Sequence, residues 1–185
     1  MVIKILNSVT IALIFVSCGG DKICEESELL ISSIGNELIQ NENYYLDDWM
    51  DTDVHEIEFK LNQDMTLCGI GYKSLDSDEE YQLSIKNKDG IVVLNEFLTF
   101  NSDALEIKEV ENIVLKSNTV YTVSRECMSC LNASSKIGQM YRPVDNNNQF
   151  TFPVQNDKIT ILNTRFYGNG GAVGNWIPLV ELAVN

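Results

Sequence analysis

The side chains that could carry acid–base or nucleophilic chemistry are few in this sequence. His55 is the only histidine among 185 residues. Catalytic triads and most zinc sites use histidine as base or ligand, and the chain has neither a His-Glu-x-x-His motif nor a Gly-x-Ser-x-Gly elbow. Ser-His-Asp hydrolysis would have to use His55, and a solvated histidine at a strand edge is the favoured interpretation. We therefore expect no catalytic residues and no enzymatic activity.

The pair Cys127 and Cys130 has the spacing of a redox dithiol or of half a zinc knuckle. A redox dithiol normally opens a helix, and a tetrahedral zinc site needs two further ligands. Here the pair follows a strand-like run in a chain with one histidine. A disulfide that involves Cys127 and Cys130 is the favoured interpretation, and reactive thiols and a metal site are the alternatives.

Two acidic clusters, at residues 47–53 and 76–80, offer oxygen ligands. Calcium takes six to eight such ligands, and alternate carboxylates in a loop can supply several of them. Neither cluster has the glycine and distal glutamate of an EF-hand loop. In a chain with 27 acidic residues, solvated loops are the default interpretation. A structural calcium ion at Asp76, Asp78 and Glu80 is the alternative, and no other cofactor is expected.

Three aromatic residues are candidates for contact with a ligand. Trp49 and Trp176 are flanked by polar or glycine-rich loop residues, and Tyr141 is the third candidate. Exposed aromatic side chains in loops can stack on sugar rings or anchor a protein partner. Tryptophan is more often packed in a core, which is the alternative for Trp49 and Trp176.

The first residues have the pattern of an export signal. Lys4 precedes a mostly apolar run from Ile5 to Val16, which is too short for the roughly 20 residues that span a bilayer. The run ends in Phe15-Val16-Ser17-Cys18, which resembles the lipobox of bacterial lipoproteins, with Phe15 where leucine is usual. The alternative is an ordinary secreted protein with a cysteine near its cleavage site.

The lipobox resemblance implies that residues 1–17 are removed and that Cys18 receives the lipid that anchors the chain to a membrane. In Gram-negative lipoproteins an Asp after the lipidated cysteine favours the inner membrane, and Gly19 stands there instead. The resemblance therefore implies a lipid-anchored protein of the cell envelope, in the outer membrane, on its periplasmic or surface face. Residues 18–28 would form a tether.

Composition narrows the choice of partners. Without residues 1–17 the chain keeps 12 basic and 27 acidic side chains, so its net charge is strongly negative. Nucleic acid and anionic lipid headgroups are poor partners for such a chain, whereas a glycan or a surface protein is compatible with it. Four cysteines besides Cys18 permit two disulfides in three pairings, although a buried free thiol at Cys68 is an equal alternative.

Alternation of apolar and polar residues predicts strands after about residue 54. Turns rich in Asn, Asp and Gly separate these runs, as in Asn87-Lys88-Asp89-Gly90. The segment Glu25–Gln40 is either a helix or a first strand. The predicted strands include residues 57–61, 65–72, 81–86, 91–100, 105–110, 113–115, 119–125, 150–152, 159–166 and 177–184. This spacing predicts an all-β domain at residues 29–185, an antiparallel two-sheet β-sandwich.

The order of elements from Glu58 to Arg125 supports this fold by resemblance. Gly69-Ile70-Gly71-Tyr72, an acidic loop, Tyr81-Gln82-Leu83-Ser84-Ile85, a turn at Asp89-Gly90 and Thr119-Val120-Tyr121-Thr122 follow one another. This order resembles PHR domains, which are jelly-roll-like sandwiches, and secreted bacterial β-sandwich domains often fused to carbohydrate-active proteins. The resemblance implies binding rather than catalysis and assigns no binding residue.

Together these patterns predict a non-catalytic envelope lipoprotein that presents a binding or accessory domain to a glycan or protein. An envelope hydrolase with paired carboxylates and a structural subunit of a surface assembly are the alternatives.

Overall fold

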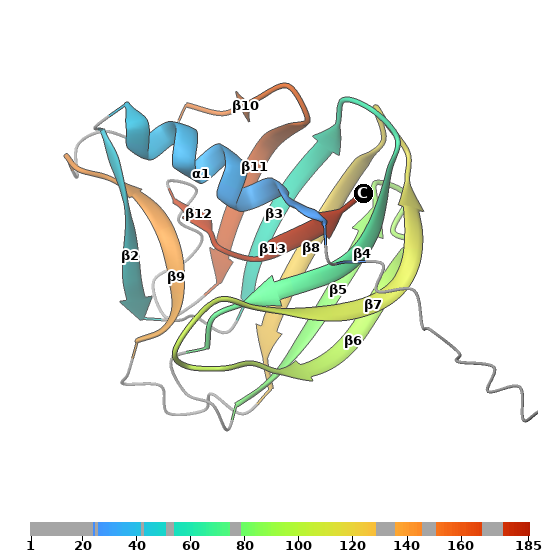
Figure 1. Cartoon of the computed structure of the whole chain (residues 1–185), viewed down its shortest axis with the longest axis horizontal. Helices are drawn as coiled ribbons and strands as arrows, with labels where there is room; N and C mark the ends of the chain where they lie inside the picture. The colour runs from blue at the N-terminus through green and yellow to red at the C-terminus, as the bar shows by residue number, and fades with distance from the viewer. Residues whose placement is uncertain are drawn as a thin grey trace, which may run out of the picture.

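The fold is built almost entirely from antiparallel strands. The computed structural model describes residues 24, 26–41, 43–50, 54–74, 79–128, 136–145, 151–167 and 176–185. Within these ranges antiparallel sheets pack against one another, with one helix at their side (Figure 1). The expected all-β sandwich fold is therefore confirmed.

The elements follow one another along the chain with short connections. In order they are β1 (Glu28–Leu29), α1 (Leu30–Gln40), β2 (Tyr44–Met50), β3 (Val54–Leu61), β4 (Met65–Tyr72), β5 (Glu80–Asn87), β6 (Val92–Thr99), β7 (Glu106–Leu115), β8 (Val120–Cys127), β9 (Lys136–Pro143), β10 (Val154–Gln155), β11 (Ile159–Tyr167), β12 (Ile177–Pro178) and β13 (Glu181–Val184).

The described strands form three sheets. A four-stranded sheet has the order β1-β13-β4-β7, a six-stranded sheet the order β10-β11-β3-β8-β5-β6, and a small sheet the order β12-β9-β2. In Figure 1 β13 crosses in front of β3 and β8, while β2 and β9 stand at the left of the sandwich. The helix α1 contacts β13 and β2, so it joins the four-stranded sheet to the small one.

The six-stranded sheet buries one of its two faces and leaves the other at the surface. In β3 every second residue is buried, and Ile57, Phe59 and Leu61 are fully enclosed. Successive side chains of a strand point to opposite faces, so Glu56 and Glu58 lie on the outer face of the sheet. A single hydrophobic cluster, which runs in sequence from Leu30 to Val184, fills the space on the inner side.

A carboxylate from another part of the chain caps the helix α1. The residue before the helix, Leu29, makes no side-chain cap, and the first turn carries no acidic residue. Glu181 of β13 supplies the missing acceptor, because its carboxylate accepts hydrogen bonds from the backbone N–H groups of Ile31 (2.8 Å) and Ser32 (2.9 Å) and from the Ser32 hydroxyl. A negative charge at this end of a helix is also favoured by the helix dipole.

Glu181 is completely buried, and its ionisation reflects two opposing effects. Burial raises the pKa of Glu181, while the hydrogen bonds from Ser32, Ile31 and Leu182 lower it in part. The carboxylate is thus desolvated and yet has donors on both oxygens. This arrangement fixes α1 to the end of the four-stranded sheet.

The helix also depends on a glycine at its contact with the small sheet. A Cβ added to Gly35 would lie 1.9 Å from a ring carbon of Tyr141, a residue of β9. The glycine that weakens the helical pattern of the sequence is therefore required where α1 packs against this ring.

A disulfide joins Cys24 to Cys68 in β4. It closes a loop with a sequence separation of 44 residues, and such a loop closure stabilises a fold by about 4 kcal/mol in the chain-entropy model. The bond decides one question that the sequence left open, because Cys68 is not a free thiol. Its location ties the start of the described chain to the four-stranded sheet.

Several expectations about individual elements need correction. The helix α1 decides the open choice for the segment Glu25–Gln40. The two strands predicted at 105–110 and 113–115 are one strand, β7, at Glu106–Leu115, and the strand predicted at 177–184 is two, β12 and β13. Phe152 lies outside the strands, and the short β10 begins two residues later. The strands β2 and β9 were not predicted, and the first acidic cluster begins in β2 rather than in a loop.

In the described ranges no helix is long and apolar enough to cross a membrane.

We predict that Glu181→Gln destabilises the protein by about 1–3 kcal/mol, because the amide would place a donor against backbone N–H donors and leave one of them unsatisfied. Chemical denaturation with urea, followed by circular dichroism, measures the change. Glu37→Gln is the matched control, since Glu37 lies exposed on the same helix. Equal stability of the two variants would show that Glu181 does not hold the helix.

Candidate binding surface

The aromatic residues predicted to contact a ligand have different environments. Tyr141 is only 2% exposed and packs in the core, so its burial removes it as a surface contact. Trp176 is half-buried, with its ring in edge contact with Phe166 and the Arg142 guanidinium 4.6 Å above its centroid. The backbone of Trp49 lies in β2 opposite Gly138, and its side chain is outside the described part of the structure. The backbones of the three residues lie in or beside the small sheet β12-β9-β2, since Trp49 is in β2, Tyr141 is in β9, and Trp176 precedes Ile177, which pairs with Tyr141.

The remaining predicted sites lie largely outside the described ranges. Cys18, Asp76, Asp78 and Cys130 are all in this category. Glu80 begins β5, and its side chain is exposed. In the described ranges no three His, Cys, Asp or Glu side chains are grouped so that they could hold a metal ion. The calcium site therefore stays a prediction.

Cys127, at the end of β8, is disulfide-bonded, and its partner lies outside the described residues. Its sulfur lies 4.0 Å from a carboxylate oxygen of Glu79. Pairing with Cys130 stays a prediction.

His55 is a buried structural residue and not a solvated one. It is 1% exposed, which contradicts the expected strand-edge position. Arg125 of β8 donates a hydrogen bond to its Nδ1 at 2.6 Å, and Phe166 packs edge-on against its ring at a centroid distance of 4.7 Å. Because the arginine only donates, the imidazole must accept at Nδ1 and is neutral. Burial lowers the pKa of His55 to about 3.

Arg125 lies at the centre of this buried polar cluster. Its guanidinium is 5.1 Å from the ring centroid of Tyr72 and 5.4 Å from that of Tyr81. Burial lowers the pKa of Arg125, and the Glu126 carboxylate raises it in part. An arginine nevertheless keeps its proton at neutral pH, so the cluster holds a buried cation between aromatic rings of both large sheets.

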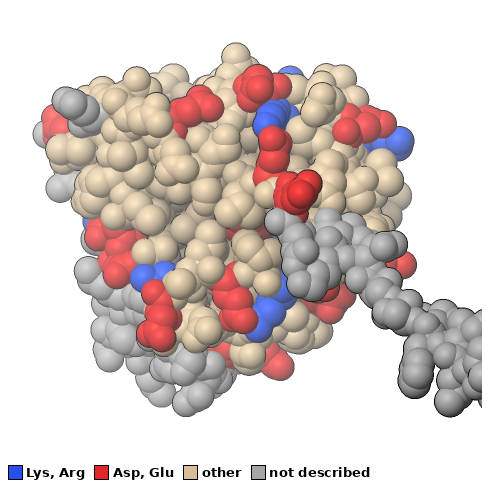
Figure 2. Space-filling view, viewed as in Figure 1, with Lys and Arg blue, Asp and Glu red and all other residues tan. Residues whose placement is uncertain are grey.

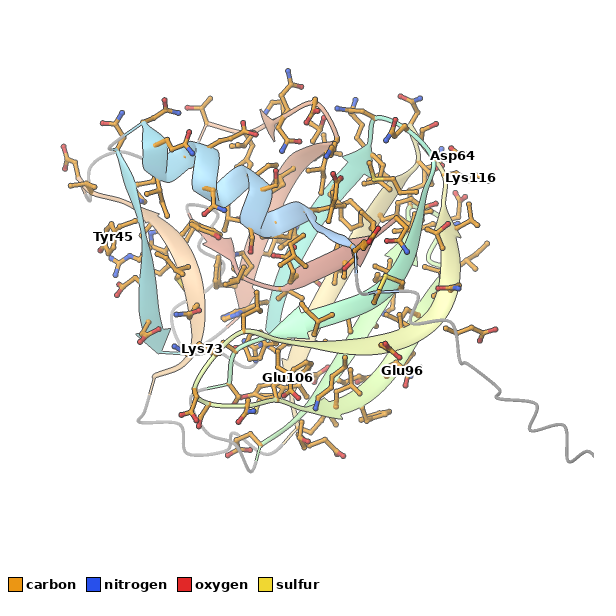
Figure 3. The ribbon with its side chains drawn as sticks, viewed as in Figure 1. Tyr45, Asp64, Lys73, Glu96, Glu106 and Lys116 are labelled. Atoms are coloured by element: carbon orange, nitrogen blue, oxygen red, sulfur yellow. A yellow bond between two sulfur atoms is a disulfide. The ribbon has the colours of Figure 1, made fainter. Side chains whose placement is uncertain are left out.

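Charged groups elsewhere on the described surface pair locally instead of gathering in a site. Asp64 accepts hydrogen bonds from Lys116 (2.9 Å) and from the backbone of Ser117 (2.8 Å), and the labelled pair lies at one end of the sandwich in Figure 3. These bonds lower the pKa of Asp64 to about 2. Glu106 pairs with Lys108 in the same way. On the face in Figure 2 the charged side chains are mostly acidic and are separated by uncharged surface.

The outer face of the six-stranded sheet is different, because it is hollowed and carries polar side chains on five neighbouring strands. Two adjoining open hollows, of about 360 and 450 Å³, share Glu56 and Lys86 in their lining. We call the two together the outer groove. Its lining comes from five neighbouring strands, β11, β3, β8, β5 and β6, and so extends over about 19 Å at the usual strand spacing.

Strand register arranges the groove in rows that run across the sheet. The first row contains the residues that pair directly from strand to strand, Arg165, Glu56, Ser124, Ser84 and Asn95. The second contains Asn163, Glu58, Thr122 and Lys86. The third contains Val54, Glu126, Gln82 and Phe97. Hydroxyl, amide and charged groups therefore make up the first two rows, whereas the third also contains Val54 and, beside the lining, Phe97.

The groove is balanced in charge although the chain as a whole is acidic. Three carboxylates and three cations line it, namely Glu56, Glu58, Glu126, Lys86, Lys88 and Arg165. The chain as a whole carries a formal charge of −14. Such a surface offers hydrogen-bond donors and acceptors in quantity without a net attraction for either sign of charge.

Sequence reasoning missed this surface. The alternation of β3 and β5 gives the outward residues of each strand, but the order of the strands in the sheet is needed to place them side by side. No known protein family matches the chain, and no curated protein matches it. The outer groove is therefore identified by its geometry and composition alone.

Because His55 is buried and neutral, we predict that the stability of the protein falls at acidic pH. The unfolded chain takes up a proton near pH 6.5, whereas the folded chain resists it down to about pH 3. The contribution of His55 to stability is therefore complete above pH 6.5 and is lost as the pH falls towards 3, by at most about 1.4 kcal/mol per pH unit. Replacement by Asn, which keeps an acceptor for Arg125, removes this dependence.

Urea unfolding of the wild type and of His55→Asn between pH 7 and pH 4 tests this prediction. As the pH falls from 6.5 towards 4, the wild type should lose unfolding free energy relative to His55→Asn. Because the chain has one histidine, its imidazole resonance can also be followed by NMR. A midpoint near pH 6.5 in the folded protein would contradict the burial.

Proposed function

We propose that this protein is a non-catalytic, lipid-anchored protein of the cell envelope that binds an extended ligand in the outer groove. The observation that carries the proposal is the groove itself, a hollowed polar face that crosses five strands. The hydroxyl and amide groups that line it can hydrogen-bond a ligand.

Two features support the location outside the cytoplasm. The amino-terminal sequence resembles a lipobox, and disulfides such as Cys24–Cys68 persist in oxidising compartments. Five residues separate Cys18 from Cys24, so the two cysteines can be at most about 22 Å apart along the chain. An anchor at Cys18 would therefore hold the sandwich close to the membrane.

The position of the disulfide also favours access to the groove. Cys24 is bonded to β4, which belongs to the four-stranded sheet. The groove lies on the outer face of the other large sheet. A chain tethered through the four-stranded sheet can present the groove away from the lipid surface.

A hydrolase is the second candidate, favoured by two carboxylates in the groove. Glu56 and Glu126 lie diagonally on the neighbouring strands β3 and β8, because Glu56 pairs with Ser124. Diagonal neighbours have their Cβ atoms about 7–8 Å apart, from where two glutamate side chains can reach the carboxyl separation of roughly 6.5–9.5 Å that inverting glycoside hydrolysis uses. Release of reducing ends by the wild type, lost in Glu126→Gln, would favour this candidate over simple binding.

We predict that Ser124→Tyr weakens ligand binding at least about tenfold, because the new ring would fill the centre of the groove between Glu56 and Ser84. The measurement is calorimetry of the mature chain with panels of neutral hexasaccharides and of dodecapeptides. Val114→Tyr places the same bulk on exposed β7 and is the control. If no member of either panel binds, or if Ser124→Tyr binds as the wild type does, the proposed groove is wrong.

The membrane anchor has its own test. Expressed in a Gram-negative host, the mature chain should begin at Cys18 and carry acyl groups, and Cys18→Ser should carry none. Mass spectrometry of the intact chain measures both. Retention of residues 1–17 without added lipid would refute the anchor.

A further inference from the structure

We infer that the ligand of the outer groove is a neutral oligosaccharide, with one sugar ring stacked on Phe97. This inference rests on the proposed function and adds the class of ligand and the residue that orients it. The two claims can fail separately, since a groove that binds peptides would satisfy the first and not the second.

Phe97 is placed as a platform at one end of the groove. It is 50% exposed on β6 and pairs with Gln82, a residue that lines the second hollow. Partners across a strand pair share a face of the sheet, so the ring stands beside the groove lining and not in the core. An exposed aromatic ring offers an apolar face of the size of a sugar ring.

Amide groups flank this ring with the chemistry that sugar hydroxyls need. The Gln82 amide donates a hydrogen bond to the Asn95 oxygen at 2.6 Å, which fixes the orientation of both side chains. The Gln82 oxygen and the Asn95 nitrogen can then accept from and donate to a ligand. A hydroxyl does both at once, so it matches this pair better than a group that only donates or only accepts.

The charge of the groove and the composition of its lining argue against the other common ligand classes. The groove carries as many cations as carboxylates in a chain of charge −14, so a polyanion gains no net attraction and meets repulsion from the rest of the surface. A cationic ligand would be drawn to the acidic surface elsewhere rather than to Lys86, Lys88 and Arg165. The apolar side chains in the lining, Val54, Val92 and Val120, lie on three different strands and pair with charged residues rather than with one another, so they form no continuous apolar patch. An uncharged, hydroxyl-rich chain remains.

The length of the groove favours several sugar units over one. The rows of polar residues cross five strands, over about 19 Å. A monosaccharide on Phe97 would reach only the Gln82 and Asn95 end. Residues on β3 and β11, such as Glu58 and Asn163, can contact the ligand only if further units continue along the groove.

The experiment titrates the mature chain by calorimetry with neutral hexasaccharides of β-1,4-linked glucose, β-1,4-linked N-acetylglucosamine, β-1,4-linked mannose and α-1,4-linked glucose. At least one should bind, and the corresponding monosaccharide should bind at least about tenfold more weakly. Phe97→Ala should weaken binding about tenfold, whereas Phe97→Tyr, which keeps a ring, should stay within about threefold of the wild type. Val114→Ala, another exposed apolar residue, should have no effect.

Thermal unfolding of each variant checks that it is folded. Binding of dodecapeptides that Ser124→Tyr abolishes, with no binding of any sugar, would overturn the ligand class and leave the proposed function intact. Sugar binding that is unchanged in Phe97→Ala would overturn the stacking platform. A wild-type dimer that Phe97→Ala converts to a monomer, with no sugar bound, would show that β6 is instead an interface between copies of the chain.

Discussion

One-sided burial of the six-stranded sheet is the constraint on which the rest of the structure depends. The same register that encloses Ile57 and Phe59 sets Glu56, Ser124 and Ser84 in line on the opposite face. A shift by one residue would exchange the two faces and expose the core. The core therefore determines the arrangement of the outer groove, the surface proposed to bind the ligand.

Buried polar contacts fix the layers to one another where apolar packing alone would allow them to slide. Glu181 holds α1 to the four-stranded sheet, and Arg125 links His55 to rings of both large sheets. Each contact buries a charged group and therefore costs desolvation energy. In return these contacts fix orientation, because the hydrogen bonds between Glu181 and Ile31 and between Arg125 and His55 form in only one alignment of the layers. These contacts restrict how the layers can align, and the loss of either partner is costly because the other would stay buried without its hydrogen bond.

The sequence predicted what depends on local pattern and missed what depends on distant partners. Alternation was enough to find β3 and β5, because each buries one face along its whole length. It failed for β2 and β9, a pair whose strands are more than 80 residues apart in the chain. The burial of His55 requires Arg125, 70 residues away, and no local signal marks that contact. The groove was missed for the same reason, since each of its rows draws on distant strands.

The central claim is that the outer face of the six-stranded sheet is the binding surface, and NMR mapping of the isotope-labelled mature chain with the tightest-binding hexasaccharide tests it most directly. We expect amide shifts to change in β11, β3, β8, β5 and β6, with the largest changes around Ser124 and Gln82. Val114 on β7 should stay unchanged. Changes confined to the four-stranded sheet or to α1, with none in the rows of the groove, would contradict it.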